Sequence, residues 1–149
     1  MNINKLNNLL QNKKLPESKL EDLIKKYPNK IDWNYIGQYQ TLSESFIEKY
    51  KDKVNWWNIS MHQKLSENFI EKYQDKVKWF WISYYQTLSE SFIEKFKDKV
   101  AWYWISESQK LSPKFIIKHI DRITKNIFKN KYYEKYPDNI KLLLRLKIK

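Results

Sequence analysis

The sequence predicts an all-α protein, an α-solenoid of stacked two-helix repeats with degenerate capping units at both ends. Three observations support this prediction. Residues recur at a fixed interval of 23 along the chain, the apolar residues within each interval have helical spacing, and glycine and cysteine are almost absent. With one Gly and no Cys in 149 residues, disulfide bridges, glycine-rich phosphate loops and the glycine turns of a β-sandwich are excluded.

The 23-residue interval defines four repeats, at 33–55, 56–78, 79–101 and 102–124. Six columns of residues keep this register. We expect them to form the packed core, with the glutamines as a polar tie that hydrogen-bonds backbone groups at helix ends. The columns are Trp33, Trp56, Trp79 and Trp102; Ile36, Ile59, Ile82 and Ile105; Gln40, Gln63, Gln86 and Gln109; Leu42, Leu65, Leu88 and Leu111; Phe46, Phe69, Phe92 and Phe115; and Val54, Val77, Val100 and Ile123.

Each repeat is expected to begin with a helix that starts at its tryptophan. In the second repeat Trp56, Ile59 and Gln63 lie at i, i+3 and i+7, which is the spacing of one helix face. Asn55, just before this helix, and Asp32, just before the first repeat, are suitable N-cap residues because their side chains accept hydrogen bonds from free backbone N–H groups.

The second helix of each repeat is expected to start after a serine and to end near a tyrosine. Ser43 is placed to cap this helix in the first repeat, and in the fourth repeat Pro113 directly follows the corresponding serine. Proline is favoured at the first helical position. Pro28 and Pro137 follow tyrosines that align with Tyr50, so the helix should stop there. Helices of about eight or nine residues need packing between repeats to be stable.

Both ends of the chain carry degraded copies of the repeat. Residues 1–32 are the expected N-terminal cap, in which 23–27 align with 46–50. Residues 125–149 are the expected C-terminal cap, which is basic and in which 132–140 align with 46–54. We expect caps and repeats to form a single repeat domain over 1–149, with end units that are polar on their outer face.

At this point the consensus resembles a known short repeat. The run W-W-N-I-S at 56–60, followed by Gln63, L-S-E at 65–67 and F-I-E-K-Y at 69–73, is similar to tryptophan-containing helical repeats in proteins of giant DNA viruses, phages and AT-rich bacteria. The resemblance covers roughly residues 27–140. It implies no settled activity and no active-site residues; for a chain of viral origin it implies a host defence protein as the partner.

Positions that differ between repeats are rich in aromatic residues. Those on the first helix would line up as a strip if successive helices stack about 8–10 Å apart, and clustered exposed aromatics are typical of binding interfaces. Two interpretations stay open for Trp57, Phe80 and Tyr103, which either face solvent or belong to the core between repeats. The candidate partner-binding residues are Tyr35, Tyr39, Trp57, His62, Trp81, Tyr84, Tyr85 and Trp104.

The net charge of +12 is distributed unevenly. Residues 1–32 carry +3, residues 125–149 carry +6, and the four repeats carry the remaining +3 between them. Lysines in the repeats alternate with Glu and Asp, which favours a solvated face of ion pairs over a phosphate-binding ladder. Binding of RNA or single-stranded DNA would combine aromatic platforms with the basic cap, although no nucleic-acid motif is present. The candidate cations are Lys125, Lys129, Lys131, Arg145 and Lys147.

Catalytic and metal-binding arrangements are not found in the sequence. His62 and His119 lie in different repeats, and His119 takes the place of Tyr50, which favours a role in the core. We therefore expect no enzyme, no catalytic residue, no cofactor and no metal ion. A membrane span needs about 18 apolar residues, which no segment provides. We expect no membrane partner and a cytoplasmic location.

Three functional hypotheses follow. The first is a non-enzymatic scaffold that binds another protein through the aromatic strip. The second is binding of RNA or single-stranded DNA through the basic C-terminal cap, and the third is homotypic assembly through the strip. Nineteen of the 25 aromatic residues lie between Trp33 and Trp104, whereas half of the net charge lies after Thr124. This separation favours a protein partner.

Overall fold

The computed structural model describes residues 2–148. Over that range every regular element is a helix, which confirms the predicted all-α class and the helix-pair repeats. The chain divides into two compact units, an N-terminal unit Met1–Lys78 and a C-terminal unit Trp79–Lys149. The helices are α1 (Ile3–Asn12), α2 (Glu17–Lys26), α3 (Trp33–Tyr39), α4 (Glu44–Lys49), α5 (Trp56–His62), α6 (Glu67–Lys72), α7 (Trp79–Tyr85), α8 (Glu90–Lys95), α9 (Trp102–Ser108), α10 (Pro113–Lys118), η1 (Lys125–Lys129), η2 (Tyr133–Lys135) and α11 (Asp138–Lys147).

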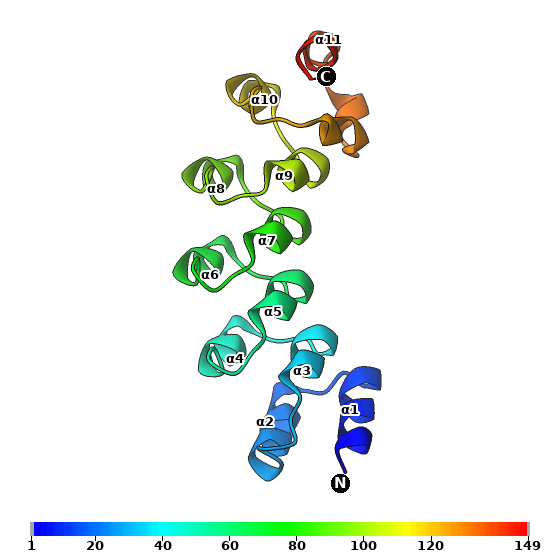
Figure 1. Ribbon diagram of the computed structural model, residues 1–149, viewed down its shortest axis with the longest axis vertical. Coiled ribbons are helices and arrows are strands. Elements are labelled where there is room, and N and C mark those ends of the chain that lie inside the picture. Colours follow the sequence, from blue (N-terminus) through cyan, green and yellow to red (C-terminus); the bar gives the residue numbers. More distant parts are fainter. Residues whose placement is uncertain (1, 149) are drawn as a thin grey trace. The chain divides into compact units, whose positions relative to one another are not determined.

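The N-terminal unit has two layers of helices (Figure 1). Helices α1, α3 and α5 pack against one another in that order, and α4 and α6 form the other layer. Helices that start at Trp have seven residues and their partners have six, fewer than the eight or nine expected. The chain leaves the helical conformation one residue earlier because Gln40 and Gln63 are extended and Tyr50 opens a turn.

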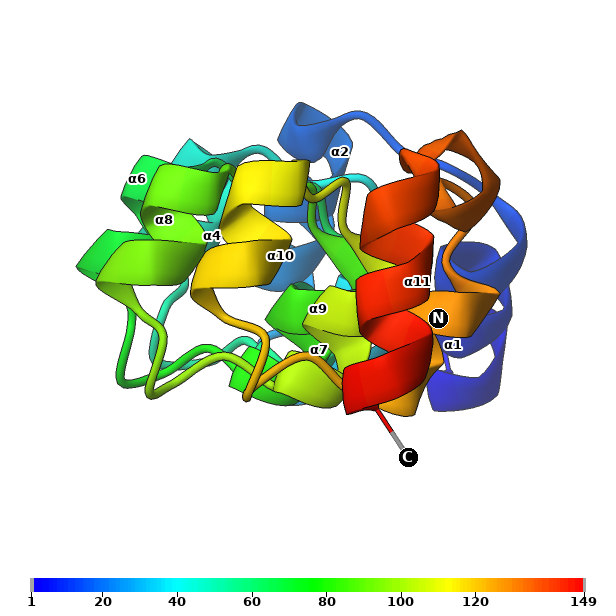
Figure 2. The ribbon, with the colours of Figure 1, turned by 90° about the horizontal axis from the view of Figure 1, so that it is seen from above.

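The C-terminal unit repeats this arrangement. Helix α9 packs between α7 and the 3-10 helix η1, while α8 and α10 form the second layer in both Figure 1 and Figure 2. The chain then passes through η2 to α11, which ends at Lys147. Within this unit the first layer therefore consists of α7, α9 and η1, and it carries most of the residues that vary between repeats.

The helix ends follow the sequence signals. Ser43 and Ser66 each accept a hydrogen bond from the backbone N–H of the phenylalanine three residues later, at 3.1 and 3.2 Å. Asp32 and Asn55 cap the tryptophan helices by accepting from the backbone N–H two residues later, each at 2.9 Å. Pro113 is the first residue of α10, where its missing N–H costs nothing. The predicted caps are thus confirmed.

Two isoleucine columns form the centre of the core, and every member is fully buried. One is the column that contains Ile36, and the other consists of Ile47, Ile70, Ile93 and Ile116. The leucine, phenylalanine and valine columns surround them and are also buried. The repeating tryptophans differ from the expectation, because Trp56 and its counterparts are only half-buried. Trp56 packs on Tyr73 with 5.1 Å between ring centroids, and its Nε1 donates to the Lys51 carbonyl at 2.9 Å. An indole needs an acceptor for its N–H, which here holds it at the edge of the core.

Within each unit, buried glutamines join a repeat to the one before it. The Gln63 amide donates to the carbonyls of Gly37 and Gln40, both at 2.8 Å, and its Oε1 accepts from the N–H of Leu42 at 2.9 Å. Gln109 makes the same three bonds within the C-terminal unit. Each glutamine satisfies carbonyls at the end of a helix that has no glycine cap, as predicted.

Charged residues of the second layer also connect successive repeats. The Glu44 carboxylate accepts from both the backbone N–H and the hydroxyl of Ser66, at 2.5 and 3.1 Å. Lys72 pairs with Glu48 at 2.5 Å, and Lys76 pairs with Asp52 at 2.9 Å. All four of these charged partners are largely exposed. The alternating charges are therefore a solvated face of ion pairs, as the sequence indicated, and not a row of free cations.

The C-terminal cap departs from the repeat. Residues 132–136, which align with the second helix, contain only the three-residue helix η2, and Pro137 precedes α11 instead of ending a helix. Asn130 takes over the glutamine role, donating to the carbonyls of Ser106 and Gln109 at 2.8 Å. The outer face of α11 is also less polar than expected, since Leu142 and Leu146 are 57% and 68% exposed.

Candidate binding surface

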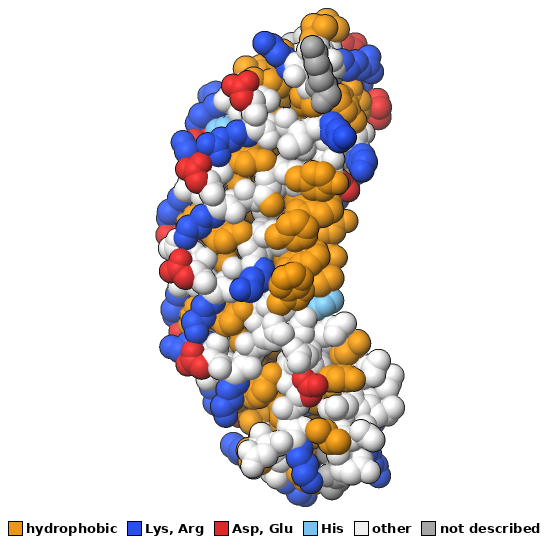
Figure 3. All heavy atoms as spheres, viewed as in Figure 1, with side chains coloured by type: hydrophobic (Ala, Val, Ile, Leu, Met, Phe, Trp, Pro, Cys, Tyr) orange, Lys and Arg blue, Asp and Glu red, His pale blue; other side chains and the backbone are white. Residues whose placement is uncertain are grey.

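Six aromatic side chains gather on the first layer of the C-terminal unit. We call this set the aromatic face. Figure 3 shows hydrophobic side chains concentrated over α7 and α9, while cations and carboxylates alternate over α8 and α10. For two of them, Phe80 and Tyr103, the sequence did not decide between a place at the surface and a place in the core. The aromatic face consists of Phe80, Trp81, Tyr84 and Tyr85 from α7 and Tyr103 and Trp104 from α9.

The rings form one connected network across the two helices. Trp104 is its centre, with centroids 4.3 Å from Tyr84, 5.4 Å from Phe80 and 4.7 Å from Tyr103. Phe80 meets Trp81 edge-on at 4.7 Å, and Tyr84 meets Tyr85 edge-on at the same distance. Edge-to-face pairs are the favoured geometry for aromatic rings, so the network holds its members in fixed positions.

Three rings of the network remain open to solvent. Phe80, Tyr85 and Tyr103 are 48%, 47% and 45% exposed, so the core interpretation of Phe80 and Tyr103 is wrong. A seven-residue helix buries only one side here, through the isoleucine and serine at its centre. Trp104 lies lower, half-buried, and its Nε1 is out of contact with solvent and has no hydrogen-bond acceptor. Trp104 therefore supports the face from below.

The first layer of the N-terminal unit has a different character. Trp57 is 51% exposed, so it too lies at the surface, and Tyr35 and Tyr39 pack together at 5.6 Å. Around them the variable positions are polar, and Asn58 donates to the Asn34 carbonyl at 3.2 Å. His62 at the end of α5 is exposed; partial desolvation and Lys14 lower its pKa below the usual range.

A hollow of about 410 Å³ lies at one end of the aromatic face. Tyr84 and Tyr85 of α7 form one wall. Lys129 and Lys131, from the end of η1 and the residues that follow it, form another, with Glu107 and Ser108 of α9 between them. The aromatic candidates and two of the basic candidates, assigned to different hypotheses from the sequence, thus line the same hollow.

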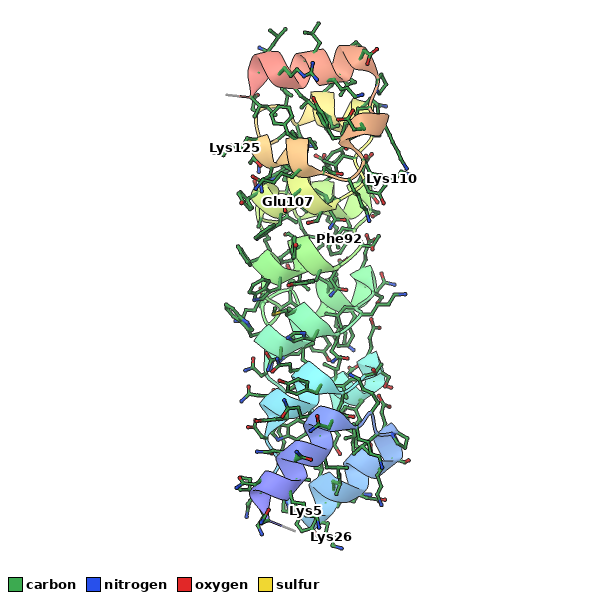
Figure 4. The ribbon with its side chains drawn as sticks, turned by 90° about the vertical axis from the view of Figure 1, so that its right-hand side faces the viewer. Lys5, Lys26, Phe92, Glu107, Lys110 and Lys125 are labelled. Carbon is green, nitrogen blue, oxygen red and sulfur yellow. The ribbon has the colours of Figure 1, made fainter. Side chains whose placement is uncertain are left out.

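The five basic candidates do not form one patch. Lys125 and Lys147 line a second hollow, of about 450 Å³, together with Asp121. Arg145 of α11 lines neither hollow. Figure 4 shows Lys125 at the start of η1 and Glu107 on the adjoining helix α9. The five cations are therefore divided between two hollows and α11, whereas binding of single strands typically uses one groove that tracks the backbone.

Histidines and carboxylates offer no metal site among residues 2–148, where no group of three or more potential metal ligands occurs. His119 is buried between Trp102 and Phe115, with ring centroids at 5.1 and 4.5 Å, and its Nε2 lies 2.6 Å from Glu94 Oε2. It fills the core position of the repeat tyrosine. Over the same described range, no helix is long and apolar enough to cross a bilayer.

Comparisons of the chain with protein-family models, curated proteins and solved structures found no match. The aromatic face is thus defined by its geometry alone. It unites Trp81, Tyr84, Tyr85 and Trp104 from the sequence-based set, which does not include Phe80 and Tyr103. One signal could have added them, since both align with Trp57, which the set already included.

Proposed function

We propose that the protein is a non-enzymatic repeat scaffold that binds another protein through the aromatic face of its C-terminal unit. The observation that carries the proposal is the half-exposure of Phe80, Tyr85 and Tyr103 on a network of mutually packed rings. Exposed apolar side chains are ordinary when scattered, but a contiguous group of them on one face marks an interaction site.

The packing of the face favours tight binding. Tyr and Trp are enriched among the residues that contribute most to protein interfaces. Tyr84 and Trp104 hold the exposed rings from below, so that little side-chain freedom is left to lose when a partner docks. The variation of these positions between repeats, against a fixed core, is what a surface fitted to one particular partner requires.

Substitution of the exposed rings tests the proposal. We would display short random peptides and protein fragments, select binders to the wild-type chain, and measure their affinity for a Phe80→Ala/Tyr85→Ala/Tyr103→Ala variant. Loss of three interface rings is expected to weaken binding by about thirtyfold, equivalent to roughly 2 kcal/mol. Trp81 and Trp104 are left in place because truncating half-buried indoles would unfold the support.

The control removes the same number of exposed apolar side chains elsewhere. Ile117, Leu142 and Leu146 are 52%, 57% and 68% exposed and lie outside the face. Their triple alanine variant is expected to bind like the wild type, with circular dichroism establishing that both variants are folded. Equal loss in the two variants, or no selected binders at all, would contradict the proposal. A concentration-dependent dimer abolished by the first variant alone would instead identify a second copy as the partner.

Nucleic-acid binding is the second candidate, favoured by the meeting of Tyr84 and Tyr85 with Lys129 and Lys131. Contacts between lysines and phosphates would make the affinity for nucleic acid fall steeply as the salt concentration rises. Fluorescence anisotropy with a labelled single-stranded oligonucleotide at low salt tests it directly, and absence of binding under that condition removes it.

A further inference from the structure

The cations beside the aromatic face differ from the lysines that pair with carboxylates of a preceding repeat. Lys72, Lys76 and Lys118 all pair with a carboxylate of the preceding repeat. Lys129 and Lys131 form no ion pair with any carboxylate of residues 2–148, although Lys131 lies over the Tyr132 ring at 5.1 Å. Two positive charges therefore border the hollow without being paired to a carboxylate.

One carboxylate of the chain also lines the hollow. Glu107 lines the hollow, but its Oε2 accepts a hydrogen bond from the side-chain amide of Asn126. Ser108 lines it too, and its hydroxyl is covered and has no hydrogen-bond partner. The hollow thus combines two cations and one carboxylate with two tyrosines, so that positive charge exceeds negative charge by one, an arrangement complementary to an anion that carries apolar groups beside it.

We propose that the hollow and the aromatic face together receive a segment of the partner protein in which Asp or Glu lies next to aromatic or aliphatic residues. The apolar side chains cover Phe80 and Tyr85, and the carboxylate lies between Lys129 and Lys131. This inference rests on the proposed function and specifies the chemistry of the partner. Charge complementarity of this kind chooses among partners and speeds their association.

A peptide fits this surface better than a nucleic acid. Successive bases need platforms that they can stack on, whereas Phe80–Trp81, Tyr84–Tyr85 and Tyr103–Trp104 meet at 86°, 82° and 90°. Those right angles give an uneven surface suited to separate side chains. The repeat that carries α7 has equal numbers of basic and acidic residues, so it adds no net positive charge to that of the two lysines.

Selection of displayed random peptides on two versions of the chain tests the inference. Peptides selected on the wild type are expected to be enriched in Asp and Glu next to Phe, Trp, Tyr or Leu. Selection on a Lys129→Glu/Lys131→Glu variant should lose that acidic enrichment while keeping the apolar one. Peptides from the first selection should bind the variant about tenfold less well at low salt, with a smaller difference at high salt.

A matched variant, Lys125→Glu/Lys147→Glu, changes the same charge at the other hollow and should bind these peptides like the wild type. The inference is overturned if both variants lose affinity equally, or if the peptides carry no acidic enrichment. If the aromatic triple variant loses binding while Lys129→Glu/Lys131→Glu keeps it, the proposed function is supported, but the inference that the partner carries an acidic residue at the hollow is rejected. Preferential binding of an oligonucleotide, lost with the same two lysines, would replace the peptide by a nucleic acid.

Discussion

A serine at the fifth position of the tryptophan helices ties its helix to the last residue of the same repeat through its side-chain oxygen. Ser83 donates to the carbonyl of Trp79 at 2.7 Å and accepts from the backbone N–H of Ala101 at 2.9 Å. Ser60 makes the equivalent bonds to Trp56 and Lys78. In the first repeat this position is Gly37, the single glycine of the chain, so no hydroxyl reaches the corresponding N–H.

Replacing Gly37 by serine should stabilise the protein. Its φ is not positive, so a side chain causes no backbone strain. A Cβ would lie 3.2 Å from Asn58 Cβ, a tight contact that requires a small shift. In the third repeat Ser83 stands at the position of Gly37, and Trp104 stands at the position of Asn58. Better helix propensity and a bond to the Asn55 N–H should together add about 1 kcal/mol to the free energy of unfolding.

Urea unfolding of the wild type, Gly37→Ala and Gly37→Ser measures this gain. Alanine supplies the Cβ and the helix propensity without the hydroxyl, so its stability is expected to fall between the other two. A serine variant less stable than the alanine variant would show that the hydroxyl finds no partner.

Single residues also mark where the sequence was informative and where it was not. Ser43 and Pro113 fixed the helix starts because capping is a local interaction that sequence position reveals. The exposure of Phe80 could not be obtained in this way, since it depends on how many sides of α7 its neighbours cover. The repeat period and the residue composition do not distinguish a helix that is buried on one side from a helix that is buried on three sides.

At the scale of the element, the short helices depend on the glutamine that reaches back from the next repeat. Gln109 is 3% exposed and bonds the N–H of Leu88 at 3.0 Å and the carbonyls of Ser83 and Gln86 at 2.9 and 2.8 Å. Without these bonds the end of α7 would bury backbone groups that have no partner.

The Gln109→Met variant is therefore expected to lose about 3 kcal/mol of stability, because a side chain of similar length leaves three buried polar groups unsatisfied. Denaturant unfolding gives the value. Lys110→Met, at the exposed neighbouring position, controls for the added apolar group and should change stability little. If the two variants are equally stable, the amide contributes no more than an ordinary surface residue.

Elements of the C-terminal cap were the least predictable. The 23-residue interval places the next member of the glutamine column at position 132. Asn130 makes the hydrogen bonds instead, because the five-residue 3-10 helix η1 is shorter than the seven-residue α-helix of a repeat. The shorter asparagine side chain suits that shorter helix. Alignment with the second helix also failed at Tyr133–Lys135, where only a short 3-10 helix forms before Tyr136, which is extended as is usual for a residue that precedes proline.

At the scale of the whole molecule, the ion pairs between repeats make stability depend on acidity. Hydrogen bonds from Lys49, Lys72 and Lys118 lower the pKa values of Glu21, Glu48 and Glu94, respectively, below the usual carboxylate range. A pKa that is lower in the folded than in the unfolded chain stabilises the fold above the unfolded value. That contribution disappears as the pH falls through the folded value.

Thermal unfolding is thus expected to be nearly independent of pH down to about pH 5 and to shift to lower temperature from about pH 4 downwards. A Lys72→Met/Lys118→Met variant has fewer lowered pKa values and should lose less stability over the same interval. Parallel loss in the two proteins would assign the acid sensitivity to general charge repulsion in this basic chain.

The carboxylate of Glu90 holds the N-cap Ser112 of the next helix, but the position that corresponds to Glu90 in the fourth repeat is Pro113. A fifth repeat added after this point would bring a serine with no glutamate to receive it. Duplication of an internal 23-residue block, by contrast, supplies every new serine with its carboxylate. Repeats can therefore be inserted or deleted in the middle of the array without loss of this contact. A repeat added after the fourth would lack it, because Pro113 has no carboxylate.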